Sequence, residues 1–234
     1  MTMPKLEVRG LDVSYGPVQV VHDLALSLTA GSITTVLGPN GAGKSTTCQA
    51  LAGLLPARAG TIEFDGVDIT RRPAWWRARR GIVLVPEGRG IFPGLSVEDN
   101  LRLVLTRSAE RDEVYERFPV LGERRRQQAG SLSGGEQQML SLAPMLVHET
   151  ELLIADEPAL GLAPRIVEQI LGIFTELRDR GTTVLLVGES PQGIIGIADQ
   201  AMLLHVGHVT WAGAASDLDQ ATLEESYFGA ARDD

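Results

Sequence analysis

The stretch ITTVLGPNGAGKSTT, residues 33–47, decides which fold the chain can adopt. Residues 33–37 are apolar or β-branched, which predicts a buried strand, and residues 44–52 predict a helix. Between them, residues 38–45 match the pattern G-x-x-x-x-G-K-[ST] in the strand-to-helix context that this pattern requires. Its glycines let backbone N–H groups turn inward at a helix N-terminus, where an anion is stabilised. The stretch therefore predicts an α/β fold with a phosphate-binding loop.

The loop supplies a set of candidate nucleotide-binding residues. Lys44 is expected to neutralise the β- and γ-phosphates of ATP, and the Ser45 hydroxyl is expected to ligate Mg²⁺. The other candidates for ATP binding in this stretch are Gly38, Pro39, Asn40, Gly41, Ala42, Gly43 and Thr46. ATP and Mg²⁺ are therefore the cofactors that the loop predicts.

A pair of carboxylates supplies the second half of the predicted site. In ELLIADEP, an apolar strand at residues 152–155 ends in Asp156 and Glu157. Open α/β sheets bind ligands at this carboxyl edge. We expect Asp156 to hold Mg²⁺ through water, and Glu157 to polarise the water that attacks ATP. An acidic pair after a strand is frequently structural on its own, and the upstream loop is what favours a hydrolytic role.

The composition limits the class of protein. The 234 residues allow one large α/β domain or two small ones, with 44% hydrophobic and 22% charged residues as in ordinary globular proteins. A net charge of −9 argues against nucleic acid as a partner. A single cysteine, Cys48, excludes an internal disulfide. The sequence shows neither an apolar run of about 20 residues nor a signal-peptide core, which predicts a cytosolic chain.

The order of strand-like and helix-like segments predicts a single domain over residues 1–234. Strands are expected at residues 6–9, 33–37, 61–64, 82–85, 152–155, 183–187 and 201–204, and helices at 44–52, 134–147 and 164–178. The later strands are nearly continuous apolar runs, which indicates a parallel sheet covered on both faces. Residues 5–69 favour an antiparallel β patch, and a charged stretch predicts an inserted helical subdomain at about 88–150.

Three polar clusters receive structural interpretations. RRPAWWRARR, residues 71–80, is expected to be an amphipathic surface helix whose arginine stems cover apolar area. The cations at 124–126 are expected on a solvated helix face. His205 and His208 flank a turn, and the sequence offers no further ligands for a metal there.

A second anion-binding helix terminus is predicted in SLSGGEQQML, residues 131–140. Ser133 and the N–H groups of Gly134 and Gly135 would form it. One γ-phosphate does not need two such cradles from one chain, so two chains arranged head to tail could sandwich the nucleotide. With this motif the chain resembles the ATP-binding cassette (ABC) ATPases, whose signature LSGGQ is LSGGE here, with Glu136 in the last position. The resemblance, over about residues 5–229, implies a second ATPase subunit, identical or paralogous.

Further motifs resemble one branch of that family. VSYG places Tyr15 where the family stacks an aromatic ring on adenine. VPEGRGIFPGLSVEDNL, DEPALGLAP and the terminal SYFG are similar to the nucleotide-binding subunits of importers of branched-chain (hydrophobic) amino acids. In this branch Glu87 stands where most members have a glutamine that ligates Mg²⁺ and senses the γ-phosphate, and Glu87 could do both. Apolar residues of IFPGL (Ile91, Phe92, Leu95) either belong to a local core or meet a membrane permease.

Two residues depart from the family pattern. Pro144 replaces an arginine inside a helix, where a proline can cost about 3 kcal/mol, so the helix is expected to kink or to shift its register. Glu189, in VGES, stands where most members have a histidine, and this branch a glutamine, that donates to the γ-phosphate. An ionised carboxylate can only accept a hydrogen bond, so Glu189 would repel the nucleotide, raise its own pKa or turn away. A bystander role for this carboxylate is equally compatible with the sequence.

The resemblance implies a peripheral subunit on the cytoplasmic face of the membrane. It would bind and hydrolyse ATP to energise transmembrane permease subunits that import branched-chain amino acids or related solutes, with a solute-binding protein as an indirect partner. Pro144 and Glu189 motivate an alternative, a weakly catalytic nucleotide-binding switch in a heterodimer. A soluble cassette of translation or DNA repair is disfavoured, because such proteins usually fuse two cassettes or carry large insertions.

Overall fold

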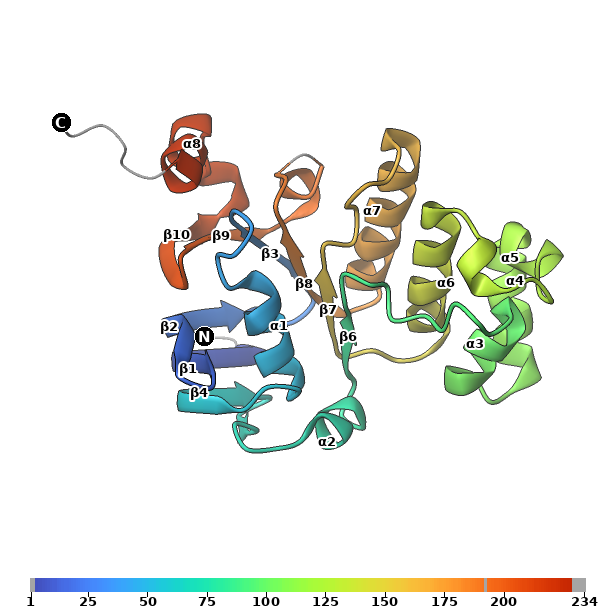
Figure 1. Cartoon of the computed structure of the whole chain (residues 1–234), viewed down its shortest axis with the longest axis horizontal. Coiled ribbons are helices and arrows are strands. Elements are labelled where there is room, and N and C mark those ends of the chain that lie inside the picture. The colour runs from blue at the N-terminus through green and yellow to red at the C-terminus, as the bar shows by residue number, and fades with distance from the viewer. Residues whose placement is uncertain (1–2, 192, 229–234) are drawn as a thin grey trace.

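The computed structural model describes residues 3–191 and 193–228, and within this part of the chain the strands form two sheets (Figure 1). The first sheet is antiparallel and has the order β2-β1-β4-β5. Its strands are β1 (Leu6–Tyr15), β2 (Val18–Leu28), β4 (Ala57–Phe64) and β5 (Val67–Asp68). The predicted antiparallel patch is confirmed. The long strand β2 was not predicted, and Gly229 of the SYFG motif lies outside the described residues.

The second sheet is mostly parallel and has the order β10-β9-β3-β8-β7-β6. Its strands are β3 (Ile33–Leu37), β6 (Ile82–Val85), β7 (Leu152–Asp156), β8 (Thr183–Gly188), β9 (Gln200–His205) and β10 (His208–Ala214). The strand β10 is antiparallel to β9 and was not predicted. Leu37 pairs with Gly188, and Asp156 with Val187, so β3, β8 and β7 end at the same edge. This register brings the predicted site residues together.

Both faces of the second sheet are covered, as the continuous apolar strands predict. Leu152 and Ile154 of β7 pack in one core with α1 (Lys44–Ala52) and the antiparallel sheet. Leu153 and Ala155 pack in another core with α6 (Gly134–Val147) and α7 (Pro164–Asp179). Helices α1 and α6 therefore lie on opposite sides of the sheet, as Figure 1 shows.

A group of helices stands at one side of the molecule, in green and yellow in Figure 1. It consists of α3 (Val97–Val104), α4 (Ser108–Arg117), α5 (Pro119–Glu123), the 3-10 turn η1 (Ala129–Ser131) and α6. These elements share their own core, which includes Val97, Leu101, Val114, Leu121, Leu140 and Ala143. The fold is thus an α/β cassette with an antiparallel sheet, a mostly parallel sheet and a helical part, as predicted.

Helix α6 continues through Pro144 to Val147 without interruption. The proline is buried, and its carbonyl accepts the N–H of His148 at 3.0 Å. Because Pro144 has no N–H, the backbone bond from this position is missing, yet packing in the core keeps the turn helical. The predicted bounds of α6, residues 134–147, are confirmed in spite of the proline.

In RRPAWWRARR the expected covering of apolar area by arginines is confirmed for Arg72, Arg79 and Arg80, whose guanidinium groups lie 4.2–5.4 Å from the ring centroid of Trp75 or Trp76. It was wrong for Arg77. The helix α2 (Ala74–Ala78) has five residues, and Arg77 is 2% exposed. Its guanidinium donates to five backbone carbonyls, those of Ala50, Leu51, Ile69, Thr70 and Arg72, at 2.6–3.1 Å. Such a planar group with several donors suits this set of acceptors. Arg77 therefore joins the end of α1 to the segment after β5.

The cations at 124–126 lie in a turn, so their prediction as a helix face was also wrong. Arg124 pairs with Glu136 at 3.1 Å, and the Arg125 guanidinium lies 3.9 Å from the centroid of the Tyr115 ring. The remaining helical elements are η2 (Ile195–Ile197), η3 (Ala215–Asp217) and α8 (Gln220–Phe228). Within the described ranges, no helix combines the length and the apolar character that crossing a membrane requires.

Candidate active site

The phosphate loop runs from the end of β3 into α1 and is held close to its neighbours. A Cβ atom on Gly38 would lie 2.1 Å from the carbonyl oxygen of Leu204, so this position accepts no side chain. Gly43 has φ +100°, in the left-handed region that favours glycine, and it caps the N-terminus of α1. The N–H groups in the first turn of α1 follow directly, and such groups at a helix N-terminus stabilise an anion.

Lys44 is buried and its ammonium group is held by the loop itself. Its Nζ donates to the carbonyls of Gly38 at 2.8 Å and Pro39 at 3.1 Å. It also lies 3.5 Å from Oε1 of Glu157. The predicted phosphate ligand and the predicted catalytic carboxylate are thus in contact, although 113 residues separate them in the chain.

Glu157 occupies a strained backbone position directly after β7. Its φ is +50°, which is unusual for a residue with a side chain. Its N–H donates to the Val187 carbonyl at 2.8 Å, and its Oε2 accepts the backbone N–H of Glu189 at 3.1 Å. Burial raises the pKa of its carboxyl group, while the Glu189 N–H and Lys44 counteract this effect. Such strain and a raised pKa are typical of functional carboxylates.

Asp156 provides a donor set that fits Mg²⁺. Its side chain is 5% exposed, and its Oδ1 has no hydrogen-bond partner among the described residues. Burial raises its pKa, the Ser45 hydroxyl hydrogen-bonds it and lowers the pKa, and the nearby charge of Glu87 raises it. Mg²⁺ prefers oxygen ligands and is commonly held by one or two carboxylates together with substrate phosphates. The residues Ser45, Glu87 and Asp156 therefore fit this ion.

Glu189 follows β8 and lies at the same edge of the sheet. Its Oε2 accepts a hydrogen bond from the side-chain amide of Asn40 at 3.0 Å. Its backbone N–H holds Glu157, as described above. The carboxylate at the predicted γ-phosphate position thus faces the loop and is bonded to a loop residue.

Tyr15 lies at the end of β1, and its ring is 47% exposed. Its hydroxyl donates to Oε1 of Gln49 on α1 at 3.3 Å, which places the ring beside the helix that begins at Lys44. An exposed aromatic ring at this point is available to stack on a base.

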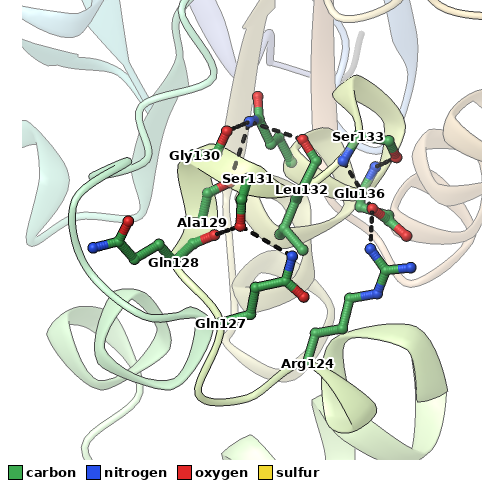
Figure 2. A network of polar contacts seen from close by, with 10 residues as sticks. Arg124, Gln127, Gln128, Ala129, Gly130, Ser131, Leu132, Ser133 and Glu136 are labelled. Carbon is green, nitrogen blue, oxygen red and sulfur yellow. Dashed lines mark hydrogen bonds and ion pairs between the residues drawn. The ribbon is translucent and has the colours of Figure 1, made fainter.

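The second predicted anion site is the N-terminus of α6, drawn in Figure 2. Ser133 and Glu136 form a capping box: the Ser133 hydroxyl accepts the N–H of Glu136, and a Glu136 carboxylate oxygen accepts the N–H of Ser133 at 2.8 Å. Arg124 holds the same carboxylate oxygen at 3.1 Å. Ser133 is exposed, and a Cβ on Gly135 would lie 2.6 Å from Ile166. The helix terminus is thus formed and faces outward.

The two anion-binding termini do not meet within one chain. The phosphate loop opens α1 on one side of the second sheet, whereas Ser133 opens α6 on the other side (Figure 1). One chain brings together Asn40, Lys44, Asp156, Glu157 and Glu189 but leaves the Ser133 terminus apart from them.

A family model described as ABC transporter matches residues 21–160, which include the loop, the α6 terminus and the carboxylate pair. The chain belongs to the ABC transporter family. It is an ATP-binding, ATP-hydrolysing subunit of that family, as its resemblance predicted.

Similar proteins agree with this assignment. The chain is 40% identical to the high-affinity branched-chain amino acid transport ATP-binding protein BraG of Pseudomonas aeruginosa, over 92% of the chain and 95% of the relative. It is 36% identical to the probable branched-chain amino acid transport ATP-binding protein LivF of Archaeoglobus fulgidus, over 89% and 91%. The ADP conformation of MJ1267, an ATP-binding cassette of an ABC transporter, has a TM-score of 0.83 with 22% identity, covering 97% of this chain and 100% of that one.

Sequence reasoning on this ABC ATPase missed two features of the site region. Leu103 and Val104 of α3 are 57% and 50% exposed and line the same hollow as Phe92. Nothing in the sequence indicated that these two apolar residues of the predicted helical segment would lie outside its core. Tyr227, in the SYFG motif, reaches the end of β8, and its signal in the sequence was a family likeness without an assigned role.

Proposed function

We propose that this ABC ATPase energises a membrane permease that imports branched-chain or other hydrophobic amino acids, or related small solutes. The relatives BraG and LivF, branched-chain amino acid transport ATP-binding proteins at 40% and 36% identity, support the class of solute. The observation that carries the proposal is an exposed apolar face beside the helical part. In a transport ATPase, the partner expected to cover such a face is a membrane permease. The subunit would lie on the cytoplasmic side of the membrane, with a solute-binding protein as an indirect partner.

We define the docking face by four exposed residues: Phe92, Leu95, Leu103 and Val104. Phe92 and Leu95 are 56% and 38% exposed, so the alternative of a local core does not account for them, whereas Ile91 packs against the core of the helical part. Asn100 fixes the loop that carries Phe92, because its Oδ1 accepts the Phe92 N–H at 2.7 Å and its Nδ2 donates to the Phe92 carbonyl at 3.0 Å. A hollow of about 440 Å³ adjoins the face and can receive a helix or loop of the permease.

The proposed mechanism assigns a task to each site residue. Lys44 exchanges the carbonyls of Gly38 and Pro39 for the β- and γ-phosphates, and backbone N–H groups at the start of α1, from Gly43 to Thr46, bind phosphate oxygens. Glu157 accepts the proton of the attacking water, and the Glu189 N–H keeps its carboxylate oriented. Tyr15 stacks on the adenine. Mg²⁺, held by Ser45, Asp156 and Glu87, would neutralise charge on the phosphates.

The proposed working unit is a dimer of cassettes, with a like or paralogous chain as the second subunit. Ser133, Gly134, Gly135 and Glu136 would contact the γ-phosphate bound to the partner's loop, because they lie across the sheet from their own loop. The chain itself would be one domain over residues 1–234, with the helical segment at about 88–150 inserted.

Co-purification with the permease tests the proposal. The chain is expressed with candidate permease subunits, and ATP hydrolysis by the complex is measured with and without branched-chain amino acids and a solute-binding protein. We expect stable co-purification and solute-stimulated turnover. Phe92→Asp and Leu103→Asp should abolish co-purification, whereas Leu54→Asp, at an equally exposed leucine outside the docking face, should not. Loss of binding in all three variants, or in none, would contradict the assigned face.

The alternative of a weakly catalytic switch rested on Pro144 and Glu189. Helix α6 runs unbroken past Pro144, which removes one of the two observations that favoured the switch. Turnover of the complex that is negligible while ATP binds tightly would favour the switch over the proposal.

A further inference from the structure

The C-terminal helix contacts the active site through Tyr227, a residue without a task in the proposed mechanism. The Tyr227 hydroxyl donates a hydrogen bond to the backbone carbonyl of Glu189. The same hydroxyl also forms a hydrogen bond with the backbone of Gly38, the first residue of the phosphate loop. One side chain thus connects α8 to the end of β8 and to the beginning of the loop.

The preceding residue anchors the helix to the sheet. Ser226 is 8% exposed, and its hydroxyl lies 3.0 Å from the hydroxyl of Thr210 on β10. Because Ser226 and Tyr227 are adjacent, this anchor limits where the tyrosine ring can lie. The helix is therefore fixed to β10 on one side and reaches the catalytic edge on the other.

Glu189 passes this constraint on to the catalytic carboxylate. Its carbonyl accepts from Tyr227, and its N–H donates to Oε2 of Glu157 at 3.1 Å. Fixing the carbonyl restrains the backbone of this residue, and with it the direction of the N–H. Burial, together with the charges of Glu189 and Glu157, raises the pKa of Tyr227 to about 12, so its hydroxyl keeps its proton and donates at neutral pH.

We infer that Tyr227 is a positioning residue for ATP hydrolysis, which holds the Glu189 backbone so that its N–H fixes the carboxylate of Glu157. The inference rests on the proposed role of Glu157 as the group that activates water. This role gives the C-terminal helix a function in catalysis. The hydrogen bonds described for the Tyr227 hydroxyl are all to backbone atoms.

Steady-state hydrolysis of Mg·ATP by the purified full chain tests this role with three variants. Tyr227→Phe keeps the ring and removes the hydroxyl, and Gln220→Ala removes an exposed hydrogen bond of the same helix, to Glu224, that does not reach the site. Glu157→Gln reports on the proposed function itself. Circular dichroism and thermal unfolding establish that each variant is folded. Hydrogen exchange of the peptide covering residues 186–191 reports on the Glu189 amide.

We expect Tyr227→Phe to lower kcat about tenfold, as for one lost hydrogen bond to a group left buried, while KM for ATP changes less than about twofold. Exchange at the Glu189 amide should become faster, and Gln220→Ala should retain the wild-type kcat. A wild-type kcat in Tyr227→Phe, an equal loss in Gln220→Ala, or a rise in KM alone would overturn the inference. If Glu157→Gln hydrolyses ATP like the wild type, the proposed function fails instead, whatever Tyr227→Phe does.

Discussion

The side-chain amide of Asn40 donates a hydrogen bond to a carboxylate oxygen of Glu189, 3.0 Å away. This bond joins the phosphate loop to the residue that follows β8, where the ABC family usually places a hydrogen-bond donor to the γ-phosphate. An ionised carboxylate held there would place a negative charge beside a bound nucleotide. The Glu189 carboxylate is thus part of the site, and removing its charge should change nucleotide binding.

Replacing Glu189 by glutamine should tighten nucleotide binding. The amide can still accept from Asn40 through its oxygen, and its NH₂ group can donate to a phosphate oxygen. We expect KM for Mg·ATP to fall about two- to fivefold at low salt, and by less at high salt because the removed repulsion is screened. Steady-state ATPase assays at two ionic strengths measure it, with Glu116→Gln on α4 as the control for a distant exposed charge.

Glu189→His restores the donor that is usual in the family. Turnover and KM that match the wild type in both Glu189→Gln and Glu189→His would mean that the carboxylate is a bystander.

Asp156→Asn should stabilise the nucleotide-free chain. The buried carboxylate has a raised pKa and an Oδ1 without a partner among the described residues, so its ionisation opposes folding. Removing this cost is expected to contribute about 1 kcal/mol at neutral pH, or roughly 2–4 °C in Tm. Thermal unfolding without nucleotide measures the change. Asp217→Asn in the turn η3 is a control for the loss of one exposed charge.

The advantage of Asp156→Asn has a predicted pH dependence. A carboxyl group whose pKa is raised by folding contributes stability below its unfolded value, here near 3.8, and that contribution is lost as the pH rises through the folded pKa. The variant and the wild type should therefore be equally stable in acid and diverge toward pH 7. A difference that grows toward low pH would contradict the raised pKa.

As the pH falls, ATP hydrolysis should be lost at a higher pH than the ordinary pKa of a glutamate would produce. Burial raises the pKa of Glu157 above its usual value of 4.5, and only the ionised form can accept a proton from water. The acid limb of the kcat–pH profile should therefore lie above pH 4.5. A limb at or below the ordinary value, measured where circular dichroism reports a folded chain, would argue against Glu157 as the base.

Arg77→Lys should destabilise the fold far more than Arg79→Lys. A lysine keeps the charge but cannot serve the five carbonyls that the Arg77 guanidinium reaches. We expect a loss of about 3 kcal/mol in the free energy of unfolding, against about 0.5 kcal/mol for the exposed Arg79. Urea unfolding monitored by tryptophan fluorescence measures both. Equal effects would mean that the buried guanidinium is replaceable.

The sequence was sufficient where one local pattern determines the structure. Helices α1 and α6 were predicted with the bounds that they have, since a glycine-rich loop or an Ser133 cap defines each start. It failed at Arg77, because a cation among exposed arginines gives no sign that distant carbonyls surround it. It left β2 and β10 unassigned, because half-buried strands lack a continuous apolar run.

The site was predictable in its parts and not in its contacts. The patterns around Lys44 and Glu157 predicted one catalytic edge, and the sheet register brings the two side chains together. The Asn40–Glu189 bond and the reach of Tyr227 depend on side-chain directions set by packing. No spacing in the sequence encodes those directions.

The most direct test compares Mg·ATP hydrolysis and ATP binding in wild type and Glu157→Gln. The account predicts that the wild type hydrolyses ATP and that the variant loses at least about 10²-fold in kcat, because a general base contributes that much or more. The variant should still bind ATP, since Lys44 and the loop are unchanged. Equal turnover in the two proteins, alone and with the permease, would contradict the account.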